Sequence, residues 1–355
     1  MKIAIIGGSI AGLEAAIRLA PKHDVTLYEE HDEIGYPLQC AEGWVRVIEP
    51  YGYISKEIRT ARIRLSDLNF KVKDEIELDV NGLLVTIDRP KMEKKMAAMA
   101  ESRGCEIVTG RKVRISELSL RGYDVVVDAS GHPSQWCREF GQRKRGAVAI
   151  QARCKIEIDD LVMDMVRDID GYFWVFPKAN GEANIGLGFY KKIWQSYPNV
   201  TLRQKLDQYI EFVGGKPMWY TGGLLGVGLN RPLVRFYGEM PVVLVGDAAG
   251  MVDPFFGEGM TKAVIAARLL AECINSHGLV GISNYERVFL KKLRWHYVVS
   301  RIMYEMKKLP FFFKMVKILL PMVQRATRNK QRYLSQRGQL NRGESTCSTG
   351  LLNQQ

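Results

Sequence analysis

A cluster of small residues near the start of the sequence has the composition of a phosphate-binding turn. The apolar segment 2–6 predicts a buried strand, and segment 13–20 predicts a helix. A turn between them points the free N–H groups and the positive dipole end of the helix at a pyrophosphate. Gly7 permits the sharp turn, and Gly12 lets helix and strand pack closely. Ser9 replaces the middle glycine of the dinucleotide-binding fingerprint and is still small. The candidate phosphate-binding residues are Gly7, Gly8, Ser9, Ala11 and Gly12.

An acidic residue follows at a spacing that suits ribose recognition. Residues 24–29 are predicted to form a second strand, and its last residue, Glu29, lies 17 positions after Gly12. A carboxylate at this strand end accepts hydrogen bonds from a ribose diol and disfavours a 2′-phosphate. Strand, turn, helix and strand form a βαβ unit. Together these features disfavour the alternative of a glycine-rich turn without a ligand.

A second strand–turn–helix segment lies in residues 242–272. A buried strand delivers Gly246 and Asp247 at its C-terminal end, which is the ligand-binding edge of a doubly wound sheet. Pro254, Gly257 and Gly259 then precede a long helix, and glycines at a helix N-terminus allow an electron-rich ring to lie against backbone N–H groups. Taken alone, the segment also fits a plain strand–turn–helix unit.

Together these segments resemble the FAD-dependent reductases and monooxygenases of the p-hydroxybenzoate hydroxylase fold group. The stretch VVDASG, which ends at Gly131, matches the middle motif of that group, and the resemblance spans about residues 1–275. It implies that Asp247 binds the ribityl chain of FAD and that Gly257 to Gly259 lie beside the pyrimidine side of the flavin. It also implies that Arg89, at the start of a helix, contacts the flavin.

Two further stretches resemble the geranylgeranyl reductase family, which saturates isoprenoid double bonds in archaeal membrane lipids and chlorophyll side chains. Residues 35–44 read GYPLQCAEGW and are similar to the family's PxxCGEG motif, with Ala41 in place of its first glycine. Residues 171–177 match an aromatic-x-Trp-x-Phe-Pro motif. The flavin halogenases have a similar WxWxIP, but the tyrosine and phenylalanine of this chain favour the reductases. The residues that the resemblance assigns to substrate binding are Tyr172, Trp174, Phe176 and Pro177.

The aromatic stretch also has a rationale independent of the family. Side chains alternate along a strand, so Tyr172, Trp174 and Phe176 point to one face. Three rings on one face form a wide apolar wall. A polyprenyl chain has no polar group, so its binding rests on buried area, at ~25 cal/mol per Å². From this stretch alone, an ordinary aromatic core strand is the more common explanation.

Cys40 and Glu42 are the candidate acids of the reaction that the resemblance implies. Saturating an isolated alkene requires a hydride at one carbon, from N5 of a reduced flavin, and a proton at the other. The proton would come from a thiol, a tyrosine or water, which makes Cys40 the first candidate and Glu42 the second. The alternative for Cys40 is a buried structural thiol.

The predicted elements give an α/β fold with α+β features: a Rossmann-type FAD-binding domain, a mostly antiparallel substrate-binding sheet and C-terminal helices. Residues 60–87 and 146–190 alternate apolar and polar side chains, as antiparallel strands do. Residues 105–120 are predicted to form short strands. The expected parts are an FAD-binding domain of residues 1–60, 85–145 and 235–285, a substrate domain of residues 60–85 and 146–234, basic helices in residues 286–325 and a disordered tail in residues 326–355.

Composition limits the other classes. The chain has 355 residues, of which 46% are apolar and 25% charged, as in ordinary globular proteins. Its six cysteines form no metal-ligand pattern, so we expect no metal, and they fit a reduced cytoplasmic compartment. No apolar run reaches the ~20 residues that a membrane-spanning helix needs.

The formal charge of +12 is carried by the C-terminal arm, because residues 1–285 are neutral in sum. A neutral body argues against nucleic acid as a partner. The arm begins with a helix that we expect to dock on the body through one apolar stripe, Trp295, Val299, Ile302, Met306 and Leu309. The later residues either contact anionic lipid at the cytoplasmic membrane face or remain solvated.

Several functions on this scaffold remain open from the sequence. No second nucleotide fingerprint is present, so NADPH and a ferredoxin are equally consistent as the electron donor. The rivals to a prenyl-lipid reductase are a monooxygenase or halogenase, a quinone-reducing flavoprotein and a non-catalytic flavin-binding protein.

Overall fold

The computed structural model describes residues 1–141, 146–166, 171–190, 201–307, 309 and 311–318. Its chain forms two compact units, Met1–Tyr304 and Glu305–Gln355. The first unit contains two β-sheets and the helices that cover them. In the second unit, residues 312–318 are helical. The tail predicted for residues 326–355 lies outside the described residues.

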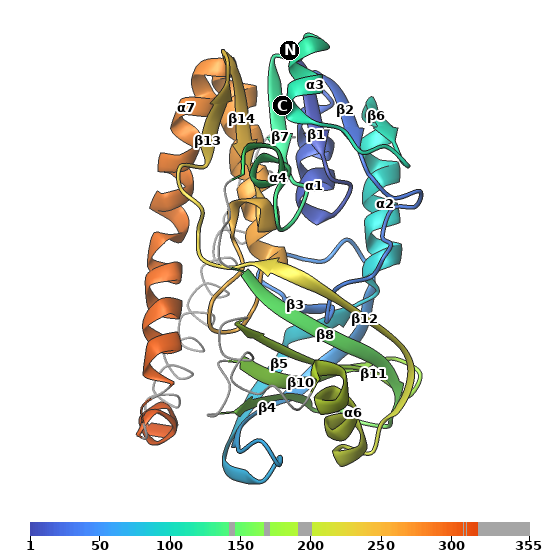
Figure 1. Ribbon diagram of the computed structural model, residues 1–355, viewed down its shortest axis with the longest axis vertical. Helices are drawn as coiled ribbons and strands as arrows, with labels where there is room; N and C mark the ends of the chain where they lie inside the picture. The colour runs from blue at the N-terminus through green and yellow to red at the C-terminus, as the bar shows by residue number, and fades with distance from the viewer. Residues whose placement is uncertain (142–145, 167–170, 191–200, 308, 310, 319–355) are drawn as a thin grey trace, which may run out of the picture. The chain divides into compact units, whose positions relative to one another are not determined.

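The first sheet, sheet A, has the strand order β13-β14-β7-β1-β2-β6 (Figure 1). All neighbouring strands from β14 to β6 are parallel, and β13 adds an antiparallel edge. Strands β7 and β14 are buried at every position, because helices and loops cover both faces of a parallel sheet. The bounds are β1 Lys2–Ile6, β2 Asp24–Tyr28, β6 Cys105–Val108, β7 Val125–Asp128, β13 Val234–Tyr237 and β14 Met240–Leu244.

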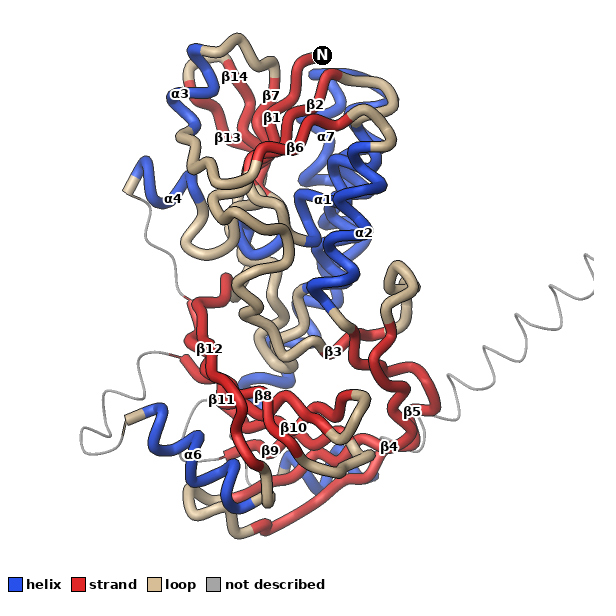
Figure 2. The backbone as a smooth tube through the Cα atoms, turned by 90° about the vertical axis from the view of Figure 1, so that its right-hand side faces the viewer, coloured by secondary structure: helices blue, strands red, loops and turns tan. Residues whose placement is uncertain are grey.

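Helices α1, α2 and α7 lie together on one side of sheet A (Figure 2). Helix α2 begins where the Asp88 side chain accepts a hydrogen bond from the backbone N–H of Lys91, with Pro90 in its first turn. Helix α7 consists of two helices joined at Gly278, whose φ of 58° interrupts the helical geometry. The bounds are α1 Ile10–Leu19, α2 Arg89–Glu101, α3 Ile115–Leu120, α4 Gln135–Phe140 and α7 Met260–Met306.

The second sheet, sheet B, has the strand order β12-β8-β11-β10-β9-β4-β5-β3. Every neighbouring pair is antiparallel except β4 and β9. Helix α6, Leu202–Phe212, packs its apolar side on this sheet. The two sheets confirm the predicted α/β fold class. The bounds are β3 Gly43–Val45, β4 Ile54–Ser66, β5 Val72–Ile87, β8 Gly146–Lys155, β9 Leu161–Val166, β10 Gly171–Lys178, β11 Glu182–Tyr190 and β12 Lys216–Gly226.

The expectation of short strands throughout residues 105–120 is half wrong. Strand β6 is present, but Ile115–Leu120 is the helix α3. The Glu139 side chain accepts hydrogen bonds from the backbone N–H groups of Ile115 and Ser116, at 2.7 and 2.9 Å. The residue that caps this helix therefore lies more than 20 positions away in sequence, so the pattern of residues 105–120 does not indicate the helix.

The second half of α7 docks on the body, but not through the predicted stripe. Trp295 is 73% exposed, and Val299 and Ile302 are each 52% exposed. The Tyr297 hydroxyl donates to the backbone carbonyl of Met251 at 2.7 Å, which fixes the rotation of the helix. The residues that α7 buries beyond its kink are Gly281, Ile282, Tyr285, Phe289, Leu293, Ser300 and Tyr304.

By length and composition alone, α7 is long and apolar enough to cross a membrane. Half of its most apolar window is buried inside the protein. Val264, Ala267 and Leu270 belong to the same core cluster as the strands of sheet A. These residues are already used in packing, as in the core helix of a globular domain.

Candidate functional site

The glycine turn between β1 and α1 packs directly on neighbouring backbone. Gly7 has a φ of +106°, and a Cβ added there would stand 2.4 Å from the carbonyl oxygen of Ala129. A Cβ on Gly12 would stand 2.0 Å from the carbonyl oxygen of Gly7. The first intrahelical bond runs from Leu13 N to Ser9 O, so the N–H groups before it point out of the helix end. The turn thus has the shape that phosphate binding requires.

Glu29 lies beside this turn, where its spacing predicted it. Its Oε2 accepts a hydrogen bond from the backbone N–H of Gly8 at 2.6 Å. Its Oε1 accepts one from the backbone N–H of His31 at 3.0 Å. The carboxylate is therefore held at the end of β2, within reach of any group bound along the turn.

Arg89 and Glu93 of α2 reach the same turn. The Arg89 guanidinium donates to Ser9 Oγ at 2.6 Å and to Glu93 Oε1 at 3.0 Å. Glu93 also accepts hydrogen bonds from Ser9 Oγ at 2.6 Å and from the backbone N–H of Ile10 at 3.2 Å. Burial acts to lower the pKa of Arg89, but the charge of Glu93 raises it. Glu93 was not predicted; its only signal is its position four residues after Arg89, on the same helix face.

Asp247 lies on the short 3₁₀ helix Gly246–Ala249 that follows β14. Burial raises the pKa of its carboxyl to about 6, although the hydrogen bond from Gly226 N and the charge of Arg89 act in the opposite direction. A Cβ on Gly246 would stand 3.0 Å from the Cβ of Ala11. The end of β14 therefore packs on the first turn of α1, which places Asp247 beside the glycine turn.

The glycines before α7 lie between Asp247 and the aromatic strand. A Cβ on Gly259 would stand 3.5 Å from Asp247 Oδ1. Gly257 has a φ of +70°, and its Cβ would stand 2.6 Å from the Tyr172 hydroxyl. That hydroxyl donates to the carbonyl of Phe256 at 2.6 Å. The predicted cofactor loop and the predicted substrate strand are thus in direct contact.

Gly131 and Pro254 occupy turns at the ends of their motifs. Gly131 follows β7 with a φ of +76°, and a Cβ there would meet no heavy atom within 4 Å. Pro254 lies in the turn after Asp253, whose Oδ1 accepts a hydrogen bond from the backbone N–H of Phe255 at 2.9 Å. Both residues shape the backbone, and neither brings a polar side chain to the site.

The aromatic motif of β10 forms the predicted ring face. The ring centroids of Tyr172 and Trp174 are 5.9 Å apart, and those of Trp174 and Phe176 are 6.3 Å apart. The Trp174 indole N–H donates to Asn184 Oδ1 at 2.8 Å. A Cβ on Gly186 would stand 2.0 Å from the indole, so this ring lies flat on a glycine of β11. Tyr172 and Phe176 are only half-buried, which leaves ring surface for a ligand.

The alternate residues of β10 face the other side of sheet B. Phe173 and Val175 are fully buried in the cluster beneath α6, where the Phe173 and Tyr209 rings are 4.4 Å apart. This alternation follows from the period of two in a strand. Pro177 is buried, and its carbonyl accepts a hydrogen bond from Thr86 Oγ1 at 2.6 Å.

Cys40 lies between the two halves of the site. Its sulfur accepts a hydrogen bond from the backbone N–H of Glu42 at 3.2 Å and lies 3.7 Å from Met260 Sδ. Its carbonyl accepts hydrogen bonds from the Gln151 and Asn184 amides of sheet B, at 2.8 and 3.1 Å. Burial raises the pKa of the thiol, although the charge of Arg89 lowers it. The thiol is therefore protonated at neutral pH.

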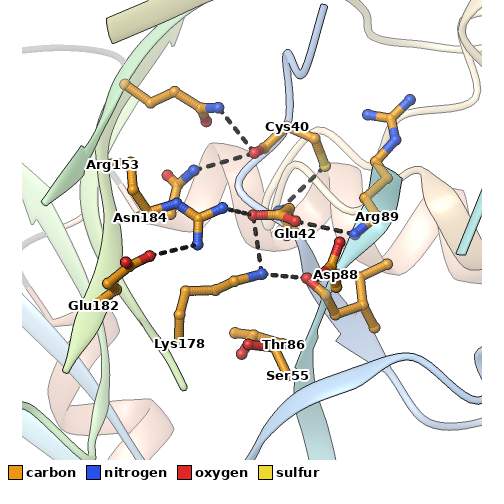
Figure 3. A network of polar contacts seen from close by, with 12 residues as sticks. Cys40, Glu42, Ser55, Thr86, Asp88, Arg89, Arg153, Lys178, Glu182 and Asn184 are labelled. Carbon is orange, nitrogen blue, oxygen red and sulfur yellow. Dashed lines mark hydrogen bonds and ion pairs between the residues drawn. The ribbon is translucent and has the colours of Figure 1, made fainter. Parts of the chain in front are cut away.

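Glu42 is fully buried, but its carboxylate points away from the Cys40 sulfur, toward sheet B (Figure 3). It pairs with Arg153 at 2.5 Å and with Lys178 at 2.9 Å. The carboxylate is therefore held between two cations and faces away from the thiol. This geometry argues against the acid role that the sequence suggested for Glu42.

Comparison with known proteins shows which family the chain resembles. Residues 148–217, which include the aromatic strand β10, match the geranylgeranyl reductase catalytic domain. The chain is 29% identical to digeranylgeranylglycerophospholipid reductase 2 of Methanothermobacter thermautotrophicus, over 82% of this chain and 83% of that protein. The chain is therefore similar to the geranylgeranyl reductases over most of its length.

Solved structures of other proteins share the scaffold of this chain. A geranylgeranyl bacteriochlorophyll reductase-like protein from Thermoplasma acidophilum aligns with a TM-score of 0.72 at 22% identity, over 90% of this chain and 91% of that one. A variant of a flavin-dependent brominase aligns with a TM-score of 0.69 at 15% identity, over 92% and 93%. At these identities the likeness shows a shared fold, and the choice between reductase and halogenase rests on the sequence relatives.

Proposed function

We propose that this protein is an FAD-dependent reductase that saturates isoprenoid double bonds of a membrane lipid. The observation that carries the proposal is the position of Cys40. Its thiol lies beside Arg89 and Met260, next to the glycine turn and α7, and its backbone carbonyl accepts hydrogen bonds from Gln151 and Asn184 of sheet B. The similarity to digeranylgeranylglycerophospholipid reductases over four-fifths of both chains supports the same substrate class.

The residues around the glycine turn fit FAD. Gly7 and Gly12 shape the turn at the N-terminus of α1, where a pyrophosphate would bind, and Glu29 would accept hydrogen bonds from the adenosine ribose. Asp247 would accept hydrogen bonds from the ribityl chain, and Gly257 to Gly259 would lie against the flavin ring. Once bound and reduced, FAD supplies a hydride from N5.

The chain itself would supply the proton and the alignment. The double bond lies along the half-buried rings of Tyr172 and Phe176, so that one alkene carbon receives the hydride and the other receives the proton of Cys40. The resulting thiolate is stabilised by the Glu42 N–H and by the charge of Arg89. Water then returns a proton to the sulfur, which balances the reaction.

The electron donor is the open part of this proposal. NADPH and a ferredoxin-type protein are both compatible with a site that has one nucleotide fingerprint. Anaerobic stopped-flow mixing of the oxidised holoenzyme with each donor distinguishes them, because only the physiological donor bleaches the flavin at a rate that supports turnover.

We also propose that the protein contacts the anionic face of the cytoplasmic membrane, where its substrate lies. The supporting observation is the exposed stripe of Trp295, Val299 and Ile302, which lies among the basic residues of α7. Aromatic and aliphatic side chains beside lysine and arginine suit the headgroup layer of an anionic bilayer. In flotation assays, W295S/I302S should bind anionic vesicles more weakly than the wild type. Equal binding would remove this stripe from the membrane contact.

Anaerobic reoxidation of the flavin tests the reductase proposal. Holoenzyme reduced with dithionite is mixed with a digeranylgeranyl glycerophospholipid, with its fully saturated counterpart as the control. We expect the flavin absorbance to return only with the unsaturated lipid. Reoxidation by oxygen with lipid hydroxylation, by halide-dependent chemistry or by a quinone would identify one of the rival activities instead.

A further inference from the structure

Glu42 has a backbone conformation that is unfavourable for its residue type. Its φ is +63°, in the left-handed region that non-glycine residues seldom adopt. The residue is also buried, with a relative exposure of 1%. Such a conformation persists only when the surrounding contacts hold it.

The contacts that hold it come from three separate elements (Figure 3). Glu42 Oε2 pairs with Arg153 of β8 and Lys178 of β10, and Glu42 Oε1 accepts a hydrogen bond from the backbone N–H of Arg89 at 3.0 Å. Arg153 also lies 3.8 Å from Glu182, and Lys178 donates to the carbonyl of Ile87. We call Glu42, Arg153 and Lys178 the Glu42 clamp.

The backbone that the clamp holds faces Cys40. With φ fixed at +63°, the Glu42 N–H donates to Cys40 Sγ at 3.2 Å. On the other side, the Glu42 carbonyl accepts a hydrogen bond from Ile87 N at 3.0 Å. The side chain therefore contacts the cysteine sulfur through its own main chain, and its charge also acts on the thiol.

The clamp also connects the thiol to the substrate strand. Lys178 directly follows the Phe-Pro of the aromatic motif. Next to Glu42, a Cβ on Gly43 would stand 2.6 Å from the Phe176 ring, so the cysteine loop lies flat on the last ring of the wall. A shift of the loop would move the sulfur relative to that ring.

We propose that Glu42 is a positioning residue for the Cys40 thiol. Its carboxylate, held by Arg153 and Lys178, fixes the left-handed backbone that aims the Glu42 N–H at the cysteine sulfur and seats the cysteine loop on Phe176. This inference rests on the proposed function, since it assigns Glu42 a part in presenting the proton donor of that reaction.

Two variants that remove the same carboxylate test the proposal. Glu42→Gly adopts a positive φ freely, whereas Glu42→Ala does not. We expect E42A to lower kcat for lipid saturation more than E42G, by roughly five- to thirtyfold, the usual cost of a left-handed residue. The KM for lipid and the bound FAD should be the same in both variants. An equal loss in E42A and E42G would overturn the proposal, because a proton donor or a purely electrostatic group is removed equally by both.

The same pair is made in a Lys178→Met background, so that a buried ammonium without its partner does not prevent folding. The reactivity of Cys40 gives a readout that does not need turnover. Iodoacetamide labelling of Cys40 is measured in the holoenzyme and located by peptide mass spectrometry. E42G should be labelled at the rate of the protein in which it is made, the wild type or K178M. E42A should be labelled at a different rate in both. Identical labelling in both members refutes the positioning role. If the wild type does not reduce the lipid but E42G and E42A still differ in labelling, only the reductase proposal is refuted.

Discussion

The residues that we propose for flavin binding, around the glycine turn (the flavin side), and those that we propose for the lipid, on β10 and around Glu42 (the substrate side), are closely packed by different means. On the flavin side, backbone lies on backbone: the carbonyl of Gly7 fills the space of a Cβ on Gly12. On the substrate side, side chains do the packing, with the Trp174 indole on Gly186 and the Glu42 carboxylate between two cations. Backbone in a strand–turn–helix unit has little room to move, whereas a ring or an ion pair can adjust. The two sides should therefore differ in how they tolerate the same small change.

The largest effect is expected for Gly12→Ala. The new methyl would clash with the Gly7 carbonyl at 2.0 Å, so the turn must open and FAD should be lost from the purified protein. Overpacking of this kind costs about 1–3 kcal/mol or more of stability. Flavin absorbance and thermal unfolding measure both effects. Gly188→Ala is the matched control, because its Cβ would stand 3.3 Å from the Trp174 ring, and it should retain FAD. Full FAD content in G12A would contradict the backbone-packing account.

Cys40→Ser tests the point where the two sides meet. If the thiol gives the proton, the rate of lipid saturation should fall by roughly a hundredfold or more, the usual contribution of a general acid. FAD content and the rate of flavin reduction by dithionite should not change, since serine keeps the size of the side chain beside Arg89 and Met260. A saturation rate equal to that of the wild type would leave Cys40 with a packing role.

Trp174→Ala should affect the substrate side alone. Removal of the central ring takes away apolar contact worth ~1.5–3 kcal/mol, so the lipid concentration for half-maximal rate should rise roughly tenfold or more. Gly186→Ala should have a similar effect, because its methyl displaces the same indole. The flavin spectrum is the internal control. A loss of FAD in either variant would show that the two sides are not separable.

The smallest effect is a pH dependence on the flavin side. The pKa of Asp247 is raised to about 6 by burial, so its carboxyl becomes protonated as the pH falls through that value. A protonated carboxyl is a poorer acceptor for ribityl hydroxyls, and FAD affinity should fall below pH 6, by roughly tenfold, the worth of one hydrogen bond to a charged group. Asp247→Asn should bind FAD weakly at every pH. Calorimetric titrations from pH 5 to 8 measure both; a wild-type affinity independent of pH would exclude the carboxylate from the FAD site.

Local patterns in the sequence predicted the elements on either side of the glycine turn. Apolar residues spaced two, three or four positions apart predict the strand, glycine turn and helix of the first 30 residues. The same spacings predict the alternation of β10 and the class of the fold. Each of these features depends on one segment, in which the repeat of apolar side chains predicts the element.

Contacts between residues far apart in sequence could not be predicted from such local patterns. Glu42 looked like an acid because its neighbours Arg153 and Lys178 are more than 100 residues away in sequence. Likewise, Glu139 caps α3 from a distant part of the chain. The hydrogen bond from Tyr297 to Met251 determines which side of α7 faces the body. Which side of a helix is buried, and whether a carboxylate is paired, depend on elements that meet only in the folded chain.

The most direct test of the account is mass spectrometry of the lipid after anaerobic incubation with the dithionite-reduced holoenzyme. The account predicts that a digeranylgeranyl glycerophospholipid gains the mass of two hydrogens for each double bond reduced, and that C40S yields far less of this product. A lipid of unchanged mass, recovered after full reduction of the bound flavin, would contradict it.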